Sequence, residues 1–205
     1  MTARHLVLLV EEPSMEAFLR ALLPRLLPQD RTFEVHPFQG KNDLLDKLLA
    51  RLRAYAEWLP RDWRILVVVD RDNDDCKSLK KKLEEIARDA GLVTRSQAGE
   101  HGWQLVNRIA IEELEAWYFG DWDAVCAAYP KVSTSTPLKA GYRDPDDIAG
   151  GTWEAFERIL QQRGYFKAGL PKVGTARALG ALLDPERCRS RSFVAFREAL
   201  AEAVR

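Results

Sequence analysis

The sequence predicts an α/β fold: a mainly parallel central sheet flanked by helices, followed by a helical C-terminal portion. Two observations lead to this prediction. Up to about residue 120, short runs rich in Val and Leu alternate with longer segments of helical periodicity, the pattern of a parallel sheet with helices on its faces. After residue 120 the strand pattern stops, and turn signals and short helical segments follow. We expect one domain over residues 1–205, with an α/β core at 1–120 and a helical extension at 121–205 packed on it.

Four strands are expected, near residues 5–10, 33–38, 64–70 and 104–111. The first, HLVLLV, and the third, RILVVVD, are continuous apolar runs, which are typical of strands buried on both faces. The second, FEVHPF, contains Pro37, which favours a strand end or an edge position. The fourth lies within WQLVNRIAI and leads into a helical pattern that we expect to begin at residue 112.

Helical segments connect these strands. We expect a first helix from Ser14 to Leu27, with Ser14 as its N-cap after Pro13, because apolar residues recur there at helical spacing. The other expected helices lie at 42–59, at 78–91 with Gly91 closing the helix, and near 152–162, 173–183 and 192–204. The segment 130–150 is long for a loop in a compact domain, which indicates either a functional or a mobile loop.

Composition narrows the class of protein. No apolar run approaches the roughly 20 residues of a membrane helix, so no membrane partner is expected. The three cysteines, Cys76, Cys126 and Cys188, have neither metal-ligand spacing nor a disulfide pattern, which favours reduced thiols and a cytoplasmic location. The formal net charge is zero, so binding of nucleic acid would need local basic patches or a second subunit.

Acidic residues follow two of the expected strands. Glu11 and Glu12 come directly after HLVLLV, and Asp70 and Asp72 come at the end of RILVVVD. Residues two apart on an extended segment point the same way, so both aspartates would project from the carboxyl edge of the sheet, where ligands bind in open α/β sheets. Converging carboxylates repel one another unless a hard cation neutralises them, which indicates a Mg²⁺ or Mn²⁺ site.

Plainer interpretations compete with this one. The run DRDNDD is also typical of a solvated turn, although its position after a buried strand favours a metal site. Glu12 is better explained by solvent exposure or by the positive end of the helix dipole. Glu16 supports a metal or faces water, and the sequence does not decide between the two.

A third acidic cluster lies in IAIEELEAWYFGDWD. If the helix begins at residue 112, Glu112 and Glu115 share one face and Glu113 points away. Glu115 is flanked by apolar residues, so we expect it to be partly buried beside a cation, a metal or a hydrogen-bond donor. The alternative is an ordinary exposed acid. Trp117 and Phe119 are expected in the core or at a partner contact.

Few cations stand out. Lys172 is expected at a helix start, where a lysine opposes the helix dipole, and this misfit indicates a role at the site. In RCRSRSF a serine, Ser190 or Ser192, is better explained as a helix N-cap than as part of a phosphate site. The chain contains neither the glycine-rich phosphate loop of P-loop ATPases nor a G-x-S-x-G nucleophile elbow. A strand-terminal D-x-D also suits phosphatases with an aspartyl nucleophile, but these usually have Thr or Val where this chain has Asn73.

This order of features, a strand-end glutamate followed by D-x-D at a later strand end, resembles the Toprim fold of topoisomerases, primases and overcoming-lysogenization-defect nucleases. More closely, nearly the whole chain resembles an uncharacterised family of small stand-alone Toprim-like bacterial proteins. The matching stretches are VEEPSMEAFLRALLP, FQGKNDLL, RILVVVDRDNDDC, NRIAIEELEAWYFGDW, RDPDDIAGGTWEAFE and RSRSFVAFREAL.

The resemblance implies a metal-dependent nuclease component that acts with a separate ATPase in bacterial defence or DNA repair. It places Glu11 at the Toprim glutamate, Asp70 and Asp72 at the D-x-D metal ligands, and Glu115 in an EAW motif, with a looser match of Lys172 to a late lysine. The chain departs from the pattern in two ways. Glu12 replaces the usual glycine, and Met15 replaces a carboxylate for which Glu16, one residue later, is a candidate substitute.

Three functions therefore remain open. The first is a Mg²⁺-dependent phosphodiester-cleaving enzyme with Glu11, Asp70 and Asp72 as ligands, in which Glu115 or Glu16 holds a second ion or orients water. The second is a non-catalytic subunit that docks on an ATPase through four aromatic anchors: Trp117, Phe119, Trp122 and Trp153. The third is a phosphatase or nucleotidyl-transfer enzyme with a small substrate.

Overall fold

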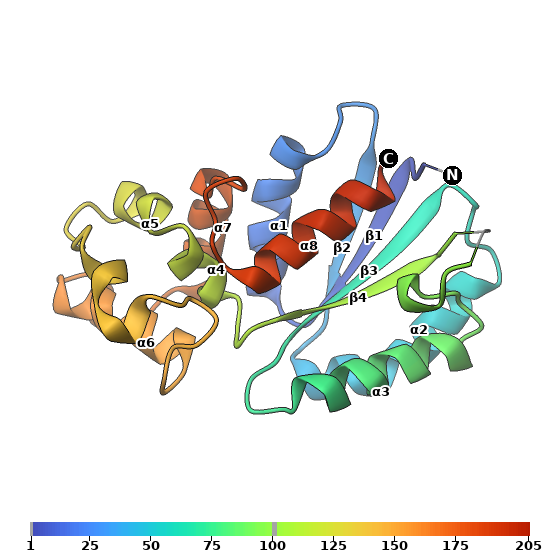
Figure 1. The fold of residues 1–205 in the computed structure, drawn as a ribbon, viewed down its shortest axis with the longest axis horizontal. Helices are drawn as coiled ribbons and strands as arrows, with labels where there is room; N and C mark the ends of the chain where they lie inside the picture. Colours follow the sequence, from blue (N-terminus) through green and yellow to red (C-terminus); the bar gives the residue numbers. More distant parts are fainter. Residues whose placement is uncertain (1, 100–101) are drawn as a thin grey trace.

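The computed structural model describes residues 2–99 and 102–205. Its centre is a sheet of four strands in the order β2-β1-β3-β4, with all three neighbouring pairs parallel (Figure 1). The strands are β1 His5–Val10, β2 Thr32–Pro37, β3 Trp63–Asp70 and β4 Leu105–Ala110. The prediction of a mainly parallel sheet flanked by helices is confirmed, with each strand within about one residue of its expected bounds.

The register places the acidic residues at one edge. Val10 pairs with both Pro37 and Val68, and Asp70 pairs with Ala110, so the carboxyl ends of the four strands lie together. Pro37 closes β2, which is an edge strand, as its missing amide hydrogen requires. Whatever follows β1, β3 and β4 is therefore brought to the same edge of the sheet.

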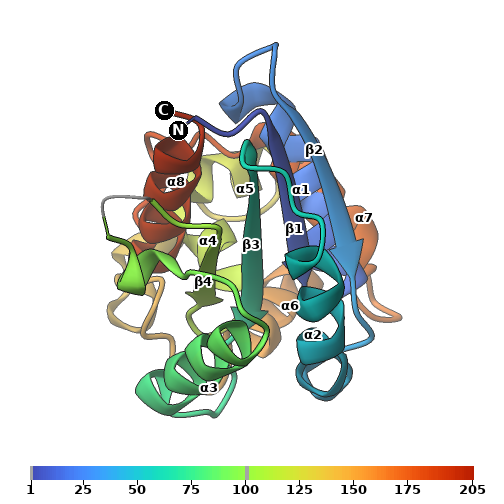
Figure 2. The same cartoon turned by 90° about the vertical axis from the view of Figure 1, so that its right-hand side faces the viewer.

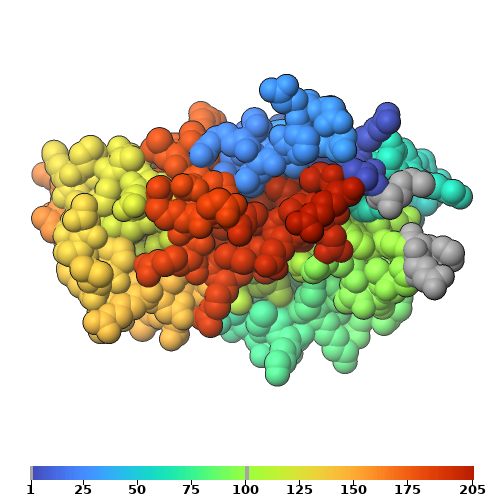
Figure 3. All heavy atoms as spheres, turned by 45° about the horizontal axis from the view of Figure 1, so that its top comes forward, coloured from blue at the N-terminus to red at the C-terminus, as the bar shows by residue number. Residues whose placement is uncertain are grey.

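Helices cover both faces of the sheet, because alternate residues of the central strands point to opposite sides. On one face Val7 and Leu9 pack with α2 Lys41–Ala56 and α3 Cys76–Asp89. On the other face Leu6 and Leu8 pack with α1 Pro13–Leu26 and α8 Arg191–Ala203 (Figure 2). Figure 3 shows α8 lying on the surface between α1 and the chain around β4.

The rest of the C-terminal portion stands at the carboxyl edge of the strands (Figure 1). It contains α4 Glu115–Gly120, α5 Trp122–Ala128, α6 Thr152–Gln162 and α7 Lys172–Leu182. The helix α7 lies against α1 at close range: a Cβ atom on Gly180 would stand 2.3 Å from the carbonyl oxygen of Phe18. This contact joins the helical portion to the sheet beside the acidic edge.

The long segment between α5 and α6 is packed. It contains two 3₁₀ turns, η2 Thr136–Leu138 and η3 Ala140–Tyr142. Its buried Asp146 accepts hydrogen bonds from the hydroxyls of Ser190 (2.7 Å) and Ser192 (3.2 Å) and from the backbone N–H of Arg191. The segment is thus anchored to the start of α8, and Ser190 is the N-cap of that helix, as predicted.

Two helix starts differ from the prediction. The helix α1 begins at Pro13 with Glu12 as N-cap, because proline at the first helical position needs no hydrogen-bond partner for its nitrogen; Ser14 lies inside the helix and donates to Glu12. The helix α4 begins at Glu115 and not at residue 112, since residues 111–114 form a bend and a turn that carry the chain off the sheet edge.

Among the helices of the described residues, none has both the length and the apolar composition needed to cross a bilayer.

Candidate metal centre

Glu11 and Asp70 meet at the carboxyl edge of β1 and β3. The backbone N–H of Asp70 donates to Glu11 Oε2 (3.0 Å), and the backbone N–H of Glu11 donates to the carbonyl of Val68 (3.2 Å). The parallel register of β1 and β3 fixes both contacts, because Glu11 simply extends β1 by one residue. The two acids that the sequence places at strand ends are therefore neighbours.

Asp70 is buried and incompletely hydrogen-bonded. Its residue surface is 6% exposed, and its Oδ1 is fully buried without a hydrogen-bond partner among the described residues. Burial raises the pKa of Asp70 well above its ordinary value, and four nearby carboxylates raise it further: Glu11, Glu115, Glu12 and Asp72. An orphaned carboxylate oxygen in this position favours a bound cation or a proton.

Glu11 shares this environment but is less enclosed. Burial raises the pKa of Glu11 to about 7. The hydrogen bond from Asp70 N–H and the charge of Lys41 act in the opposite direction, while Asp72 and Glu12 add to the rise. The carboxylates at this edge are thus held near one another, and the charge of Lys41 offsets the effect of burial on Glu11 only in part.

Asp72 does not continue the extended backbone on which the sequence prediction relied, although its charge still acts on Asp70 and Glu11. The strand ends at Asp70, and Asp72 adopts a left-handed backbone with φ of 49°. Its Oδ2 accepts an ion-paired hydrogen bond from Lys41 Nζ at 2.7 Å, and its side chain is 42% exposed. Because the chain turns here, the two aspartates of D-x-D face different surroundings.

The rest of the DRDNDD run also forms the turn that the plainer interpretation expected. Asp74 N–H donates to the carbonyl of Arg71 (3.0 Å), and Asp75 is the N-cap of α3, accepting from Ser78 N–H (2.9 Å). Only Asp70 is buried in the sheet edge, so the run is divided between a site residue and helix-capping residues.

Lys41 is a site residue that sequence reasoning missed. It is the first residue of α2, and its ammonium bonds Asp72, Asp74 Oδ2 (2.8 Å) and the carbonyl of Arg71 (2.9 Å). Gly40, with φ of 104°, donates its N–H to the carbonyl of Glu11 (3.0 Å) and brings Lys41 to the edge. The sequence did contain a signal for Lys41. A lysine at a helix start opposes the helix dipole, and the same feature led us to single out Lys172.

Glu115 enters the same region from α4. It is 4% exposed, and burial together with Glu113 raises the pKa of Glu115 to about 8, while Lys172 acts to lower it. Tyr118, one turn further along α4, is also buried close to Glu115 and Asp70, and their charges help to raise its pKa above the ordinary value. Sequence reasoning did not single out Tyr118.

Glu112 and Glu113 have roles set by the turn before α4. Because residue 112 is not helical, Glu112 and Glu115 do not share a helical face, and that expectation is wrong. Glu112 forms an ion pair with Arg71. Glu113 points to α6, where it accepts from Thr152 Oγ1 (2.9 Å) and Trp153 N–H (2.8 Å) and so caps that helix.

Lys172 lies near the acids of the sheet edge, whereas Glu16 is paired with an arginine on the surface of α1. Lys172 begins α7, and its Nζ stands 4.2 Å from the ring centroid of Trp153, close enough to Glu115 to influence its pKa. Glu16 instead forms an i,i+4 ion pair with Arg20 (2.7 Å) and lines a surface hollow between α1 and α7. The structure therefore brings Lys172 beside the acids, whereas the partner of Glu16 is an arginine.

The carboxylates at the carboxyl edge of the sheet are suitable ligands for a hard cation, but they are not arranged here as a complete set of metal ligands. Carboxylate oxygens are the ligands that Mg²⁺ prefers, and Asp70 Oδ1 is buried and unpartnered among the described residues. Within residues 2–99 and 102–205, however, no three His, Cys, Asp or Glu side chains are grouped so that they could hold a metal ion. Lys41 accounts for part of this, since it is bound to Asp72.

The aromatic residues considered as docking anchors are mostly internal. Trp117, Phe119 and Trp122 are 0%, 1% and 4% exposed, and their rings pack on neighbouring aromatic side chains. Trp153 is half-buried beneath Lys172. The proposal that Trp117, Phe119 and Trp122 are surface anchors for a partner is therefore wrong.

Fold and site together define a parallel α/β protein with buried acids at the carboxyl edge of its sheet. The chain belongs to a family described as a domain of unknown function, DUF4276, whose model matches residues 10–201. The search of curated proteins and the search of solved structures gave no match.

Proposed function

We propose that this protein is a Mg²⁺-dependent, Toprim-type phosphodiester-cleaving protein, the nuclease component of a two-part system whose other part is a separate ATPase. The assignment to a Toprim-like group rests on the sequence resemblance, in which Glu11, Asp70 and Asp72 occupy the acidic positions. The proposed setting, bacterial defence or DNA repair, has the same basis.

One observation carries the proposal. A buried carboxylate, Asp70, has an oxygen without a hydrogen-bond partner among the described residues and stands next to Glu11 at the edge where parallel sheets bind ligands. A structural aspartate would be expected to have its oxygens satisfied, as those of Asp146 and Asp121 are. The unpartnered oxygen of Asp70 is one that a divalent cation would satisfy.

Each residue at the acidic edge has a separate role in the proposed reaction. Glu11 and Asp70 would hold the cation, Asp72 would join them once it releases Lys41, and Glu115 would orient water from the far side of the cluster. Glu16 is the weaker alternative for that last role because Arg20 neutralises it. Lys41 and Lys172 are the cations beside the acids, and each would contact a phosphate oxygen.

Hydrolysis at such a site is an in-line displacement. The oxygen of a water molecule bonds to phosphorus as the bond from phosphorus to the departing sugar oxygen breaks. One water proton passes to a carboxylate, and the departing oxygen takes up a proton. A bound Mg²⁺ lowers the pKa of water and offsets the charge on phosphate.

The test is cleavage of plasmid and oligonucleotide DNA by the purified protein in Mg²⁺ and in Mn²⁺. We expect slow cutting, favoured by Mn²⁺ and low salt and made efficient by the partner ATPase. Asp72→Ala and Glu11→Ala should each abolish it, and Lys172→Ala should weaken it less. Lys82→Ala, on the other face of the sheet, is the matched control. Cleavage that persists unchanged in the Asp72→Ala protein would contradict the proposal.

A further inference from the structure

One part of the chain departs strongly from overall charge balance. Residues 158–183 contain no Asp or Glu but carry five cations: Arg158, Arg163, Lys167, Lys172 and Arg177. We call this stretch, which covers the end of α6, the following loop and α7, the cationic segment. In a protein whose formal net charge is zero, this stretch therefore carries an excess of positive charge. The carboxylate of Glu157, directly before this stretch, accepts a hydrogen bond from the backbone N–H of Leu170 (3.0 Å).

These cations are available for a ligand. All five residues are exposed, and within the part of the chain that the structure describes none of them forms an ion pair with a carboxylate. Lys172 contacts the ring of Trp153, which leaves its charge unneutralised. An anion can bind an exposed cation that has no ion pair without first displacing a carboxylate.

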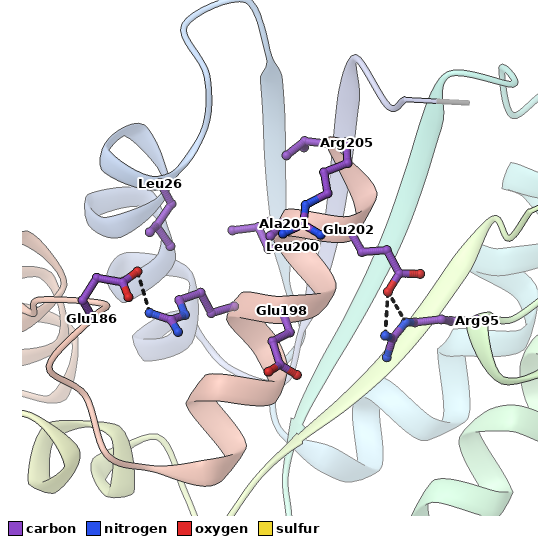
Figure 4. A pocket seen from close by; sticks show the side chains of 10 residues that line it. Leu26, Arg95, Glu186, Glu198, Leu200, Ala201, Glu202 and Arg205 are labelled. Atoms are coloured by element: carbon purple, nitrogen blue, oxygen red, sulfur yellow. Dashed lines mark hydrogen bonds and ion pairs between the residues drawn. The ribbon is translucent and has the colours of Figure 1, made fainter.

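The arginines of another hollow offer a contrast. In the hollow along α8, Arg95 is bound to Glu202 and Arg197 to Glu186 (Figure 4). An anion that bound Arg95 or Arg197 would have to displace a carboxylate, and of the arginines in this hollow only Arg205 has no ion pair among the described residues. Surface cations therefore differ in whether a carboxylate already neutralises them, and among the described residues those of the cationic segment have no such partner.

The cationic segment also leads to the acidic edge. Lys172 lies close enough to Glu115 to influence its pKa. Further along α7, Val173 and Arg177 line a hollow of about 510 Å³ with Pro13, Glu16 and Arg20 of α1. Glu16 is paired with Arg20 there, so Arg177 is the cation of this hollow without an ion pair among the described residues. We call this hollow the α1–α7 groove. Its lining residue Pro13 is two residues from Glu11, which brings one part of the groove near the candidate metal centre.

We propose that the cationic segment and the α1–α7 groove bind the phosphodiester backbone of a nucleic-acid strand and lead it to the acidic edge. The cations are spread over two helices and a loop, which fits a ligand with many phosphates along its length better than one with a single phosphate. That the bound strand leads to the acidic edge rests on the proposed function, whereas binding of the strand does not depend on cleavage.

Binding is measured by fluorescence anisotropy with a labelled single-stranded oligonucleotide in EDTA, so that no cleavage occurs. Lys172→Ala with Arg177→Ala should raise Kd about tenfold at low salt. The slope of log K against log salt should fall in magnitude by about 1.4, which is about 0.7 for each phosphate that the variant no longer neutralises. The matched control is Arg51→Ala with Lys82→Ala, which should change Kd less than about twofold. These are two exposed cations on α2 and α3 that form no ion pair within the described residues.

Folding is checked by circular dichroism and the melting midpoint of each variant. Lys167→Ala with Arg177→Ala leaves the Lys172–Trp153 contact intact and should also weaken binding. Equal losses in the cationic-segment and control variants would overturn the inference, as would absence of binding at low salt. Tighter binding to vesicles of anionic lipid than to the oligonucleotide would also overturn it, by indicating a membrane surface as the ligand. Binding without cleavage would contradict only the proposed enzymatic activity.

Discussion

At Asp70, two stability effects oppose each other. The strand needs this residue buried at the end of β3, yet burial and its acidic neighbours raise the pKa of its carboxyl group. An acid with a raised folded-state pKa destabilises the folded protein at every pH above its ordinary pKa, including pH 7. The metal-free protein therefore retains a folding penalty that a cation would remove.

Asp70→Asn should stabilise the metal-free protein and remove its response to metal. We expect the free energy of unfolding at pH 7 to rise by about 1 kcal/mol, which corresponds to about 2–4 °C in the melting midpoint. In the unaltered protein, millimolar Mn²⁺ should raise the midpoint by binding the folded state. Differential scanning calorimetry with and without Mn²⁺ measures both effects; a variant that is less stable and still responds to Mn²⁺ would contradict this account of Asp70.

Lys41 competes with a metal ion for Asp72. Lys41→Met keeps much of the side-chain length but leaves Asp72 and Asp74 without their ammonium partner, so Mn²⁺ should bind several-fold more tightly. Lys47→Met is the control, because Lys47 lies on the same helix and its one ion pair among the described residues is with Asp43. Titration calorimetry gives both affinities. Weaker Mn²⁺ binding in the Lys41 variant would mean that the lysine organises the site and does not compete for it.

Sequence reasoning located some of these residues and not others. Glu11 and Asp70 could be predicted because a parallel sheet brings the residues after its strands to one edge. The direction of Asp72 could not, since it depends on a left-handed backbone that aspartate adopts only in particular surroundings. The contact between Lys41 and Asp72 joins residues 31 apart in the chain, and no local pattern encodes such a pairing.

Among the helices, the contact between α1 and α7 depends on one missing side chain. Gly180→Ala would place a Cβ atom 2.3 Å from the backbone oxygen of Phe18, which cannot move without shifting α1. We expect a loss of about 1–3 kcal/mol in the free energy of unfolding, typical of overpacking. Chemical denaturation of the variant measures this loss.

Gly174→Ala is the matched control on the same helix. The Cβ atom that this substitution adds would be 3.9 Å from Pro171 Cβ, which is an ordinary van der Waals contact. Alanine is also the better helix former, so this change should leave stability equal or raise it by up to about 1 kcal/mol. Similar losses in both variants would show that α7 is sensitive to any substitution and not to close packing at Gly180.

Helix positions followed from periodicity. The start of α1 is set locally by Pro13, whereas the packing of the loop before α6 depends on longer-range contacts. The length of segment 130–150 indicated a functional or a mobile loop, but its Asp146 is held by three donors at the start of α8. These donors come from residues more than 40 positions away. The sequence alone therefore predicted a long connection but not its packed state.

For the whole molecule, acid stability should depend partly on Glu84 of α3. Burial acts to raise its pKa, but hydrogen bonds from Ser96, Thr94, Asn107 and Lys80 outweigh this and lower the pKa to about 2. Because the folded-state pKa lies below the ordinary value of 4.5, Glu84 stabilises the protein above that pH. This contribution is lost as pH falls from about 4.5 towards 2.

Glu84→Gln should reduce the free energy of unfolding at pH 7 by about 1–2 kcal/mol, because the hydrogen bonds would no longer have a charged acceptor. The difference from the unaltered protein should shrink below pH 4.5 and vanish near pH 2. Urea denaturation at a series of pH values tests this. Glu85→Gln is the control, since the one ion pair of Glu85 among the described residues is a long surface pair with Lys81 (3.9 Å). A difference between the Glu84 variant and the unaltered protein that is constant with pH would count against the assignment.

The first and last described residues, Thr2 and Arg205, lie together at the end of the sheet opposite the acids (Figure 1). Ala3 N–H donates to the carbonyl of Ala203 (2.9 Å), and Thr2 Oγ1 donates to that of Arg205 (2.5 Å). Proteins with adjacent ends tolerate circular permutation. A short linker would close this chain into a ring, and new ends could be cut at the exposed turn around Trp58, leaving every residue of the acidic edge in place.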